Sequence, residues 1–205
     1  LPDGTVVLVP GGVANMGSNA FITIPRGITV VQPGGTVYVL DGSYSLPVEI
    51  TKTLNLLGAG APGTVINGSG SPTPAITITA SVNDVVIEGF RIADWGWGLV
   101  IVGPSSGLGV SSNVFSNCTT LAITGTLVNS SRFVNNEIGN GGAGISLDTV
   151  NNTTLDNNHI HDLSGFGIRI YGSAGASTGN ALSYNNIHDL DWDGIRVGVN
   201  CVNTR

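Results

Sequence analysis

The chain carries two columns of apolar positions that recur at nearly constant spacing. In the first column an Asn precedes an apolar residue by two positions, with steps of 23, 22 and 27 residues between copies. In the second, two apolar residues flank a single position, with steps of 23, 22, 24, 23 and 27 residues. The first column is Asn113-x-Phe115, Asn136-x-Ile138, Asn158-x-Ile160 and Asn185-x-Ile187; the second is Ile76/Ile78, Leu99/Ile101, Leu121/Ile123, Ile145/Leu147, Ile168/Ile170 and Ile195/Val197.

This repeat predicts a solenoid of short β-strands. A fixed period of 20–50 residues is typical of stacked coils, and apolar-x-apolar texture is typical of strands. Both columns lengthen at their last step, which indicates one insertion around Tyr171–Asn180. We expect about seven coils with three short strands each, the third strand being the least distinct.

Asn and Gly at fixed places in the repeat predict structural roles. Stacked Asn amides can hydrogen-bond from coil to coil, and Asn tolerates the left-handed backbone of a tight corner. A glycine precedes four of the apolar strands, and we expect the same corner role for it. These glycines are Gly98, Gly144, Gly167 and Gly194.

The two ends of the chain depart from the repeat. Residues 1–35 hold four prolines and break the period, which predicts an N-terminal cap with a short helix near Arg26–Gln32. The β-helix proper is expected over residues 36–205. Because the chain begins with Leu1 rather than Met, we interpret it as a processed or excised segment. Only Gly198–Arg205 follow the last repeat, which predicts an open C-terminal end, truncated there or covered by another subunit.

Composition narrows the function classes. Charged residues make up 10% of the chain, the net charge is −6, and seven residues are Lys or Arg. The chain therefore lacks the excess of basic residues that is typical of proteins that bind nucleic acids or anionic membranes. No apolar run approaches the ~20 residues of a membrane span. Five N-glycosylation sequons favour an extracellular or cell-surface location, although an Asn/Ser/Thr-rich chain also produces sequons by chance. They begin at Asn67, Asn117, Asn129, Asn151 and Asn152.

The two cysteines lie several coils apart. Coils stack about 4.8 Å apart, so Cys118 and Cys201 should be too distant for an intramolecular disulfide. The alternatives are two partly buried free thiols, or a disulfide bond from Cys201 to another subunit.

The repeat resembles a known family. The segments Thr36-Val-Tyr-Val-Leu-Asp-Gly-Ser-Tyr44, Val48-Glu-Ile-Thr-Lys-Thr-Leu-Asn-Leu-Leu-Gly-Ala-Gly60 and Val86-Ile-Glu-Gly-Phe-Arg-Ile92 are similar to the opening coils of right-handed parallel β-helix proteins of the pectate-lyase-like superfamily. The resemblance, over roughly residues 20–200, implies an all-β right-handed solenoid. It does not select one function, because the superfamily contains lyases, epimerases, glycosidases, tailspikes, adhesins, surface-layer components and metal-handling proteins.

One corner loop holds most of the candidate glycan-binding residues. It reads Ala93-Asp-Trp-Gly-Trp97, His161-Asp-Leu-Ser-Gly-Phe166 and His188-Asp-Leu-Asp-Trp-Asp193. Stacking would bring Asp94, Asp162 and Asp189 to one edge and place His161 under His188. Aromatic faces beside carboxylates suit a sugar cleft, whereas the alternative is that the rings pack the corner and the carboxylates cap turns. The candidate rings are Trp95, Trp97, Phe166 and Trp192.

The acidic run at the last corner is a candidate calcium loop. Asp189, Asp191 and Asp193 precede Gly194, as in the first half of a D-x-D-x-D-G motif. Asn200 stands where a calcium loop of the EF-hand type would place its bidentate Glu, so a solvated acidic corner is the alternative to bound Ca²⁺.

Catalytic candidates are few. A lyase needs a base beside a group that neutralises the uronate. Lys52 is the only lysine. Arg169 and Arg196 should point outward from adjacent coils. They would form either a ladder on the outer face or a site for an acidic sugar near Asp162 and Asp189. A carboxylate pair such as Asp162 and Asp189 would also satisfy the spacing of a glycosidase. The histidine candidates at this edge are His161 and His188.

Three functions are therefore compatible with the sequence. The leading hypothesis is an extracellular structural or adhesive surface protein that self-associates head-to-tail through the ends of its solenoid, with filaments or arrays as the expected assemblies. The alternatives are a polysaccharide lyase or epimerase acting on acidic glycans, and a glycan-binding module without turnover.

Overall fold

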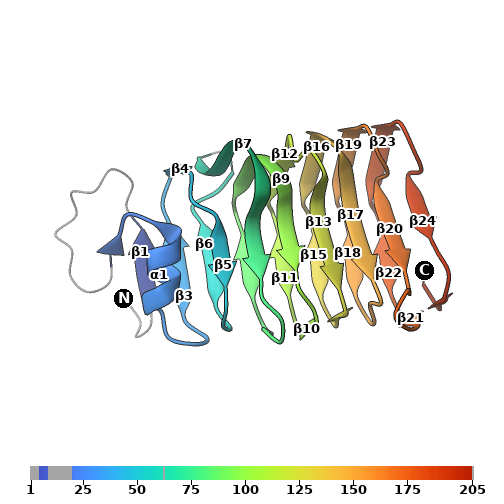
Figure 1. Ribbon diagram of the computed structural model, residues 1–205, viewed down its shortest axis with the longest axis horizontal. Coiled ribbons are helices and arrows are strands. Elements are labelled where there is room, and N and C mark those ends of the chain that lie inside the picture. Colours follow the sequence, from blue (N-terminus) through green and yellow to red (C-terminus); the bar gives the residue numbers. More distant parts are fainter. Residues whose placement is uncertain (1–4, 9–19, 62, 205) are drawn as a thin grey trace.

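The molecule is a right-handed parallel β-helix of about seven coils (Figure 1). A computed structural model describes residues 5–8, 20–61 and 63–204. Every strand pairing is parallel, and successive partners come from successive coils, so the coils lie side by side along the long axis. The all-β solenoid predicted from the apolar columns is confirmed.

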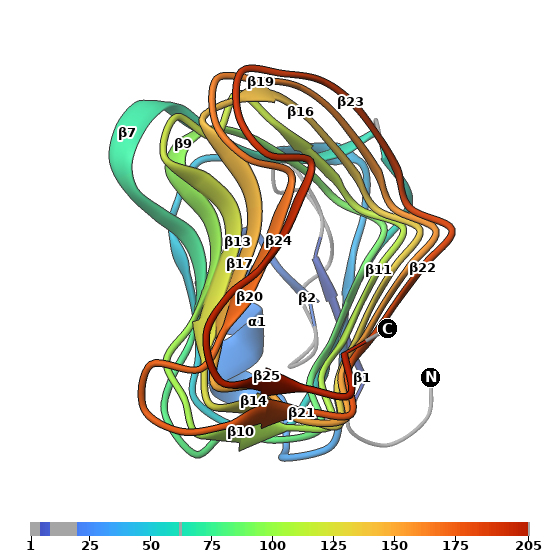
Figure 2. The same ribbon diagram turned by 90° about the vertical axis from the view of Figure 1, so that its right-hand side faces the viewer.

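Two large sheets and two short ladders form the walls of the coils (Figure 2). The nine-stranded sheet contains β2 (Ala20–Phe21), β1 (Thr5–Leu8), β3 (Thr36–Val39), β6 (Asn55–Gly58), β8 (Val86–Glu88), β11 (Gly109–Ser111), β15 (Arg132–Val134), β18 (Thr154–Asp156) and β22 (Ala181–Ser183). The path of the twelve-stranded sheet contains β23 (Asn186–Leu190), β19 (His159–Leu163), β16 (Glu137–Gly141), β12 (Val114–Ser116), β9 (Arg91–Ile101), β13 (Leu121–Thr126), β17 (Ala143–Asp148), β20 (Ile168–Tyr171) and β24 (Ile195–Val197). The strands β4 (Gly42–Tyr44) and β5 (Val48–Ile50) join this sheet through β7 (Thr64–Ile78), and the short ladders pair β10 (Ser105–Ser106) with β14 (Val128–Asn129) and β21 (Ser177–Thr178) with β25 (Cys201–Val202).

The nine-stranded sheet supplies the third strand of each coil. Its central residues Val110, Phe133 and Leu155 are buried and stack in register. In these strands a single central residue faces inward, so they lack the apolar pair that marks the other columns. That is why this strand is the least distinct in the sequence.

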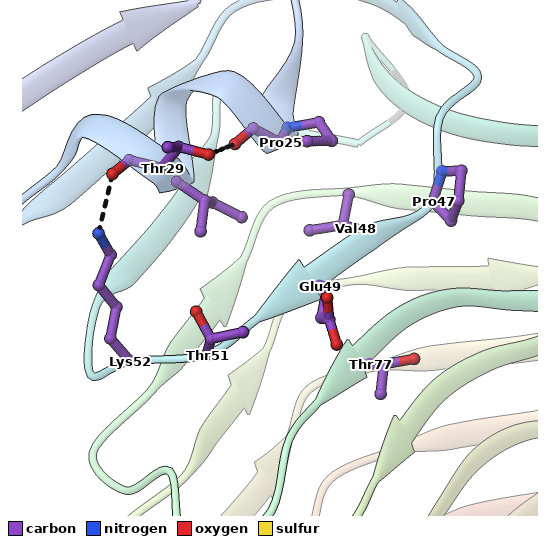
Figure 3. A pocket seen from close by; sticks show the side chains of 9 residues that line it. Pro25, Thr29, Pro47, Val48, Glu49, Thr51, Lys52 and Thr77 are labelled. Carbon is purple, nitrogen blue, oxygen red and sulfur yellow. Dashed lines mark hydrogen bonds between the residues drawn. The ribbon is translucent and has the colours of Figure 1, made fainter.

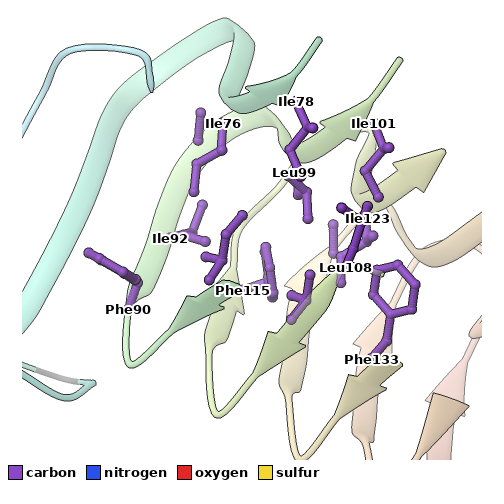
Figure 4. Packing of buried hydrophobic residues seen from close by; sticks show 14 of the residues in the cluster. Ile76, Ile78, Phe90, Ile92, Leu99, Ile101, Leu108, Phe115, Ile123 and Phe133 are labelled. Atoms are coloured by element: carbon purple, nitrogen blue, oxygen red, sulfur yellow. The ribbon is translucent and has the colours of Figure 1, made fainter. Parts of the chain in front are cut away.

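A continuous apolar core fills the solenoid (Figure 4). The apolar pairs stack coil on coil, for example Ile76 on Leu99 and Leu99 on Ile123, and all three side chains are fully buried. Residues at every second position therefore face the same interior, as the period of two requires. The predicted pair Leu121/Ile123 is wrong by two residues, because Leu121 pairs with Trp97, and Ile123 and Gly125 pair with Leu99 and Ile101.

The first predicted corner loop is part of a strand. Ala93–Trp97 lies within β9, which runs from Arg91 to Ile101 without interruption. The strand bends at Asp94, whose φ is +61°. The prediction of a loop there is wrong, because β7 pairs with β9 before, within and after the bend, through Ala93, Trp95 and Trp97.

The asparagine column forms a buried ladder, as predicted. The Asn136 amide nitrogen donates to Val110 O at 2.9 Å and to Asn158 Oδ1 at 3.0 Å, and its oxygen accepts from the Asn113 backbone N–H at 3.2 Å. Asn113 and Asn158 repeat this pattern in their own coils. The left-handed residue is the preceding one, for example Asn135 (φ +56°), so that part of the expectation is wrong for the ladder asparagines.

The glycines before the apolar strands are required by close approach. A Cβ on Gly144 would lie 2.2 Å from the carbonyl oxygen of Gly167, and one on Gly167 would lie 2.5 Å from that of Gly194. Gly98, Gly144, Gly167 and Gly194 are not among the residues with positive φ, so the predicted conformational reason is wrong. The neighbouring coil backbone occupies the space that a side chain would need.

The N-terminal helix covers one end of the core. α1 (Ile24–Val30) lies two residues upstream of its expected position, and it buries Ile24 and Ile28. The Lys52 ammonium donates to the carbonyls of Thr29 and Val31 at the C-terminal end of this helix. The predicted cap over residues 1–35 falls partly outside the described residues.

The last coil is less covered than the others. Ile195 and Val197 are about half exposed, at 51% and 49%, whereas their partners Ile168 and Ile170 are fully buried. The inserted residues lie between β20 and β21, near the expected position.

Cys118 and Cys201 are both unbridged, as expected, and burial, together with the charge of Asp94, raises the pKa of the Cys118 thiol to about 12.

Candidate functional site

An outward-facing column of side chains runs the length of the twelve-stranded sheet. Each member pairs in register with the next, and each stands between two inward-facing apolar residues except Thr124, which lies between Ile123 and Gly125. The column starts with a carboxylate and ends with two guanidinium groups: Glu49, Thr77, Val100, Thr124, Ser146, Arg169 and Arg196. The predicted stacking of Arg169 on Arg196 is confirmed.

Aromatic rings and a hydroxyl surround Arg169. The Arg169 guanidinium carbon lies 4.6 Å from the centre of the Phe166 ring and 5.0 Å from that of Tyr171. Its Nε and Nη2 atoms donate to Ser146 Oγ at 3.3 and 3.1 Å. Cation–π contacts and hydrogen bonds therefore hold this side chain in one orientation.

A buried carboxylate lies behind this arginine. Asp148 is 8% exposed and pairs in register with Tyr171. It accepts hydrogen bonds from the Ser173 backbone N–H at 2.8 Å, from the Ser173 hydroxyl, and from Thr149 Oγ1 at 2.9 Å. Burial alone would raise the pKa of Asp148, but these hydrogen bonds and the charge of Arg169 outweigh it and lower the pKa below its usual value.

Arg196 completes a shallow hollow at the C-terminal end of the face. The hollow has a volume of about 390 Å³ and is lined by Arg169, Tyr171, Arg196, Gly198 and Val199. The nearest carboxylate to Arg196 is that of Asp193, with Oδ2 4.0 Å from Nη1 and both side chains well exposed. An exposed pair at this distance leaves most of the guanidinium donors open to a ligand.

A second hollow lies where α1 meets the same sheet (Figure 3). Its volume is about 580 Å³, and Pro25, Thr29, Glu49, Lys52 and Thr77 are among its lining residues. The ammonium of Lys52 points to the helix carbonyls, as the dashed contact in Figure 3 shows for Thr29. The single lysine therefore closes the end of α1 and is not presented as a base.

The three candidate aspartates do share one column. Asp94, Asp162 and Asp189 occupy equivalent left-handed positions, with φ between +52° and +61°. The coils between them carry Asn117 and Asn140 at that position, with φ of +55° and +54°. Asp94 accepts from the side chain of Asn117 at 2.6 Å, so the backbone geometry of a corner explains the Asp/Asn preference.

The histidines of this edge lie as the repeat predicts. His161 pairs with His188 in register, and their rings stack with centres 5.6 Å apart. His161 Nδ1 is 2.7 Å from Asp162 Oδ2, and His188 Nδ1 is 2.7 Å from Asp189 Oδ2. His159, which the sequence analysis did not single out, joins them through a 3.0 Å contact between its Nε2 and that of His188.

The candidate aromatic residues do not form one exposed face. Trp95 is 2% exposed and donates from Nε1 to Ile66 O at 3.1 Å, so its assignment to a glycan surface is wrong. Phe166 is 9% exposed and serves as a wall for Arg169. Trp97 is half-buried, and Trp192 is 70% exposed in the last coil.

The acidic run does not converge on a metal ion. Asp189 is paired with His188, and Asp193 faces Arg196. Within the described part of the chain, no group of three or more His, Cys, Asp or Glu side chains is arranged to hold a metal. The expected calcium loop of Asp189, Asp191 and Asp193 is therefore not formed.

The arginines and the His/Asp edge lie on different sides of the coil. Figure 2 shows β19 and β23 at the top and β20 and β24 on the flank. Among the described residues, no ion pair joins Arg169 or Arg196 to Asp162 or Asp189. The expectation that these four residues form one site is wrong, since the coil turns between them.

The sequon asparagines differ in exposure. Asn117 and Asn152 are exposed, whereas Asn67, Asn129 and Asn151 are partly buried. Asn151 donates to Asn129 Oδ1 at 3.0 Å and accepts from Thr178 N at 2.9 Å, so its amide belongs to a ladder. Glycosylation at any of the five stays a prediction.

Sequence reasoning did not find Asp148, Ser146 and Tyr171 as neighbours of Arg169. The signal was present in part, because all three lie at outward positions of the apolar-x-apolar column or directly after it. The hydrogen bonds from Ser173 to Asp148 could not be foreseen, since they depend on the path of the inserted loop.

Comparisons with known proteins identify the fold family. A family model described as "Right handed beta helix region" matches residues 74–205. No curated protein matches the chain in sequence. In the part of the chain that the structure describes, no helix is long and apolar enough to cross a membrane.

Solved structures with a similar fold include carbohydrate-acting enzymes. The catalytic domain of a GH87 α-1,3-glucanase in complex with nigerose superposes with a TM-score of 0.75 at 17% identity, covering 100% of this chain and 39% of that one. A second GH87 α-1,3-glucanase structure, with tetrasaccharides, has a TM-score of 0.67 at 14% identity, covering 90% and 40%. Pectin methylesterase PemA from Erwinia chrysanthemi has a TM-score of 0.53 at 14% identity, covering 90% and 70%. The chain thus spans about 40% of the GH87 catalytic domains that it matches.

Proposed function

This chain belongs to the right-handed β-helix family, and we propose that it is an extracellular module that binds an acidic polysaccharide through Arg169 and Arg196. The observation that carries the proposal is the stacking of these two guanidinium groups in adjacent coils beside a hollow of about 390 Å³.

Like charges in adjacent coils favour an anionic ligand. Coils stack about 4.8 Å apart, so two cations held there repel one another by about 1 kcal/mol even in water. A carboxylate placed between them outweighs that repulsion by attracting both cations, and it accepts hydrogen bonds from both. Guanidinium groups suit this role, because their fork of donors matches the two oxygens of a carboxylate.

The walls of the hollow add to the argument. Phe166 and Tyr171 hold the Arg169 side chain from two sides, so little conformational entropy is lost when a ligand binds. Tyr171 is only partly buried and lines the hollow, where its ring can lie against a sugar. A uronate supplies both the carboxylate and the apolar ring face that these groups recognise.

The similar folds support a carbohydrate ligand. The GH87 structures are α-1,3-glucanases with bound oligosaccharides, and PemA is a pectin methylesterase. The extracellular assignment rests on such a ligand and on the sequons.

We propose binding without turnover, because the carboxylate nearest Arg169 is already engaged. Asp148 accepts three hydrogen bonds from Ser173 and Thr149 and has a lowered pKa, which does not suit a general acid. Lys52 is held by helix carbonyls. A lyase or epimerase on acidic glycans remains the alternative, which an assay of product release from the same polysaccharides would reveal.

The hypothesis of a structural or adhesive surface protein stays a prediction. No comparison concerns filaments or adhesion, and the exposed apolar side chains of the last coil, Ile195 and Val197 among them, are the observation that favours self-association.

The test is calorimetric titration of the chain with polygalacturonate, with an uncharged α-1,3-glucan as the comparison ligand. We expect saturable binding of the acidic polymer, weakened about tenfold or more by Arg169→Gln or Arg196→Gln. Arg132→Gln is the matched control, since Arg132 is exposed on β15 of the opposite sheet. Absence of binding, or equal weakening by all three variants, would contradict the proposal.

A further inference from the structure

All three histidines of the chain lie in one cluster. The 205-residue chain contains three His, and their ring centres are 4.4 Å (His159–His161), 5.2 Å (His159–His188) and 5.6 Å (His161–His188) apart. His159 and His161 project from the same side of β19, and β23 stacks on it in the next coil. The strands that carry the cluster, β19 and β23, lie at the top of the coil in Figure 2, whereas β20 and β24, which carry the arginines, lie on the flank.

Carboxylates orient two of the three rings. His161 and His188 each place Nδ1 2.7 Å from the carboxylate of the following residue, Asp162 and Asp189. An imidazole that donates from Nδ1 carries its lone pair on Nε2. Such carboxylate–histidine pairs are the usual support of metal-ligating histidines, because they fix the tautomer and the ring orientation.

Two of the ring nitrogens are already at chelating distance. His159 Nε2 lies 3.0 Å from His188 Nε2. Two imidazoles that each bind one ion at about 2.0–2.1 Å have their nitrogens about 3 Å apart when the angle at the metal is near 90°. An ion that replaces the hydrogen bond between these rings requires both rings to turn, so that their Nε2 lone pairs point to the ion and not to one another.

A third ligand lies next to the pair. Glu137 pairs in register with His159, its side chain is 54% exposed, and Oε1 is 3.8 Å from His161 Nε2. His161 Nε2 is buried and has no hydrogen-bond partner. Since three ligands do not converge in the described residues as they stand, Glu137 must rotate to complete the set.

Gly139 explains how the His161 ring can lie beneath the other rings of the cluster. A Cβ on Gly139 would lie 2.8 Å from Cε1 of His161, so the ring lies directly against the glycine. The His161 side chain is 15% exposed and stacks under His188, whose side chain is 43% exposed. His161 thus positions His188 while the outer rings face solvent.

We propose that His159 and His188, with Glu137 as the third ligand, bind a borderline transition-metal ion such as Zn²⁺. Two imidazoles and one carboxylate are the donor set that such ions prefer, whereas Ca²⁺ requires oxygen ligands alone. The site is separate from the acidic run at Asp191 and Asp193, and it does not depend on the proposed polysaccharide function.

The test is calorimetric titration of the full chain, produced without a histidine tag, with ZnCl₂. We expect one saturable Zn²⁺ site per chain and no saturable heat with CaCl₂. His188→Asn should weaken Zn²⁺ binding at least tenfold, and Asp189→Asn by about 10- to 100-fold through loss of ring orientation. Asp191→Asn is the matched control and should leave the affinity unchanged, because it removes an exposed carboxylate of the same corner.

Three results would overturn the proposal: no saturable Zn²⁺ binding, equal affinity in His188→Asn, or loss of binding in Asp191→Asn alone. Circular dichroism of each variant checks that the β-helix is intact. Should His188→Asn not fold, His159→Gln removes the other nitrogen at an exposed position, and retention of the wild-type affinity in that variant overturns the proposal equally.

Discussion

Single residues in this molecule are chosen by what the adjacent coil presents to them. The buried asparagines illustrate this, because the side chain of each one bonds backbone groups of the preceding coil and the amide oxygen of the ladder asparagine in the next coil. Asn136 donates to Val110 O and accepts from the backbone N–H of Asn113. No other side chain offers a donor and an acceptor at this length with so little bulk.

Asn136→Ala should therefore lower the free energy of unfolding by about 3 kcal/mol or more, because it leaves several buried polar groups without partners. Urea denaturation followed by circular dichroism measures it. Asn135→Gly is the control, since Asn135 is exposed with φ +56° and glycine accepts that conformation. A loss for Asn136→Ala no larger than for Asn135→Gly would show that the ladder is not stabilising.

The lowered pKa of Asp148 makes stability depend on pH. A carboxyl group whose pKa is lower in the folded than in the unfolded chain stabilises the fold above its unfolded value, which is 3.8 here. That contribution is lost as the pH falls from about 4 through the folded-state pKa.

Asp148→Asn should flatten the acid limb of the stability curve and reduce stability at pH 7 by about 1–3 kcal/mol, through weaker bonds from Ser173 and Thr149. Urea denaturation at a series of pH values from 7 to 3 tests this. Asp191→Asn, an exposed carboxylate of the last coil, is the control and should keep the wild-type slope. Parallel curves for Asp148→Asn and the wild type would contradict the assignment.

Strands and bends decide which aromatic rings are exposed. β9 continues through the positions that were expected to form a loop, and this continuity turns Trp95 into the core. Trp192 lies in the gap between β23 and β24 and is 70% exposed. The two tryptophans occupy similar sequence contexts and have opposite environments.

Trp95→Ala should destabilise the fold by about 3–5 kcal/mol through the cavity that it leaves. Trp192→Ala should change stability by less than about 1 kcal/mol, as expected for an exposed side chain. Thermal denaturation of both variants measures the difference. Similar melting temperatures for the two would mean that Trp95 is not a core residue.

The whole molecule is quasi-one-dimensional, since each coil contacts only its neighbours. Inner coils have a partner on both sides, whereas β22, β23 and β24 have a partner on one side among the described residues. Local stability should therefore decline toward this end.

Hydrogen exchange should show slower exchange for residues 132–170 than for residues 181–197. The same measurement at increasing protein concentration tests the predicted self-association, because a copy seated on the last coil would protect it. Light scattering provides the mass in parallel. Equal protection of both segments in a monodisperse monomer would contradict the expected gradient.

The amino-acid sequence by itself determined the repeat, the class of fold and most of the partners within each column. These follow from the sequence because a parallel in-register stack repeats the same environment every coil, so spacing along the chain equals position in space. The Asn ladder, the His161/His188 stack and the Arg169/Arg196 stack were all predictable for that reason. The exception is Leu121, which pairs with Trp97 and not with Leu99.

Only the tertiary structure decided how the columns lie relative to one another around the coil. The angle of each bend depends on backbone conformations such as that of Asp94, and on the path of the inserted loop, neither of which has a periodic signal. The structure therefore separated the arginines from the aspartates at 162 and 189, placed Ser173 on Asp148, and buried Trp95. A solenoid sequence specifies which residues stack, whereas the bends between its strands specify which stacks share a face.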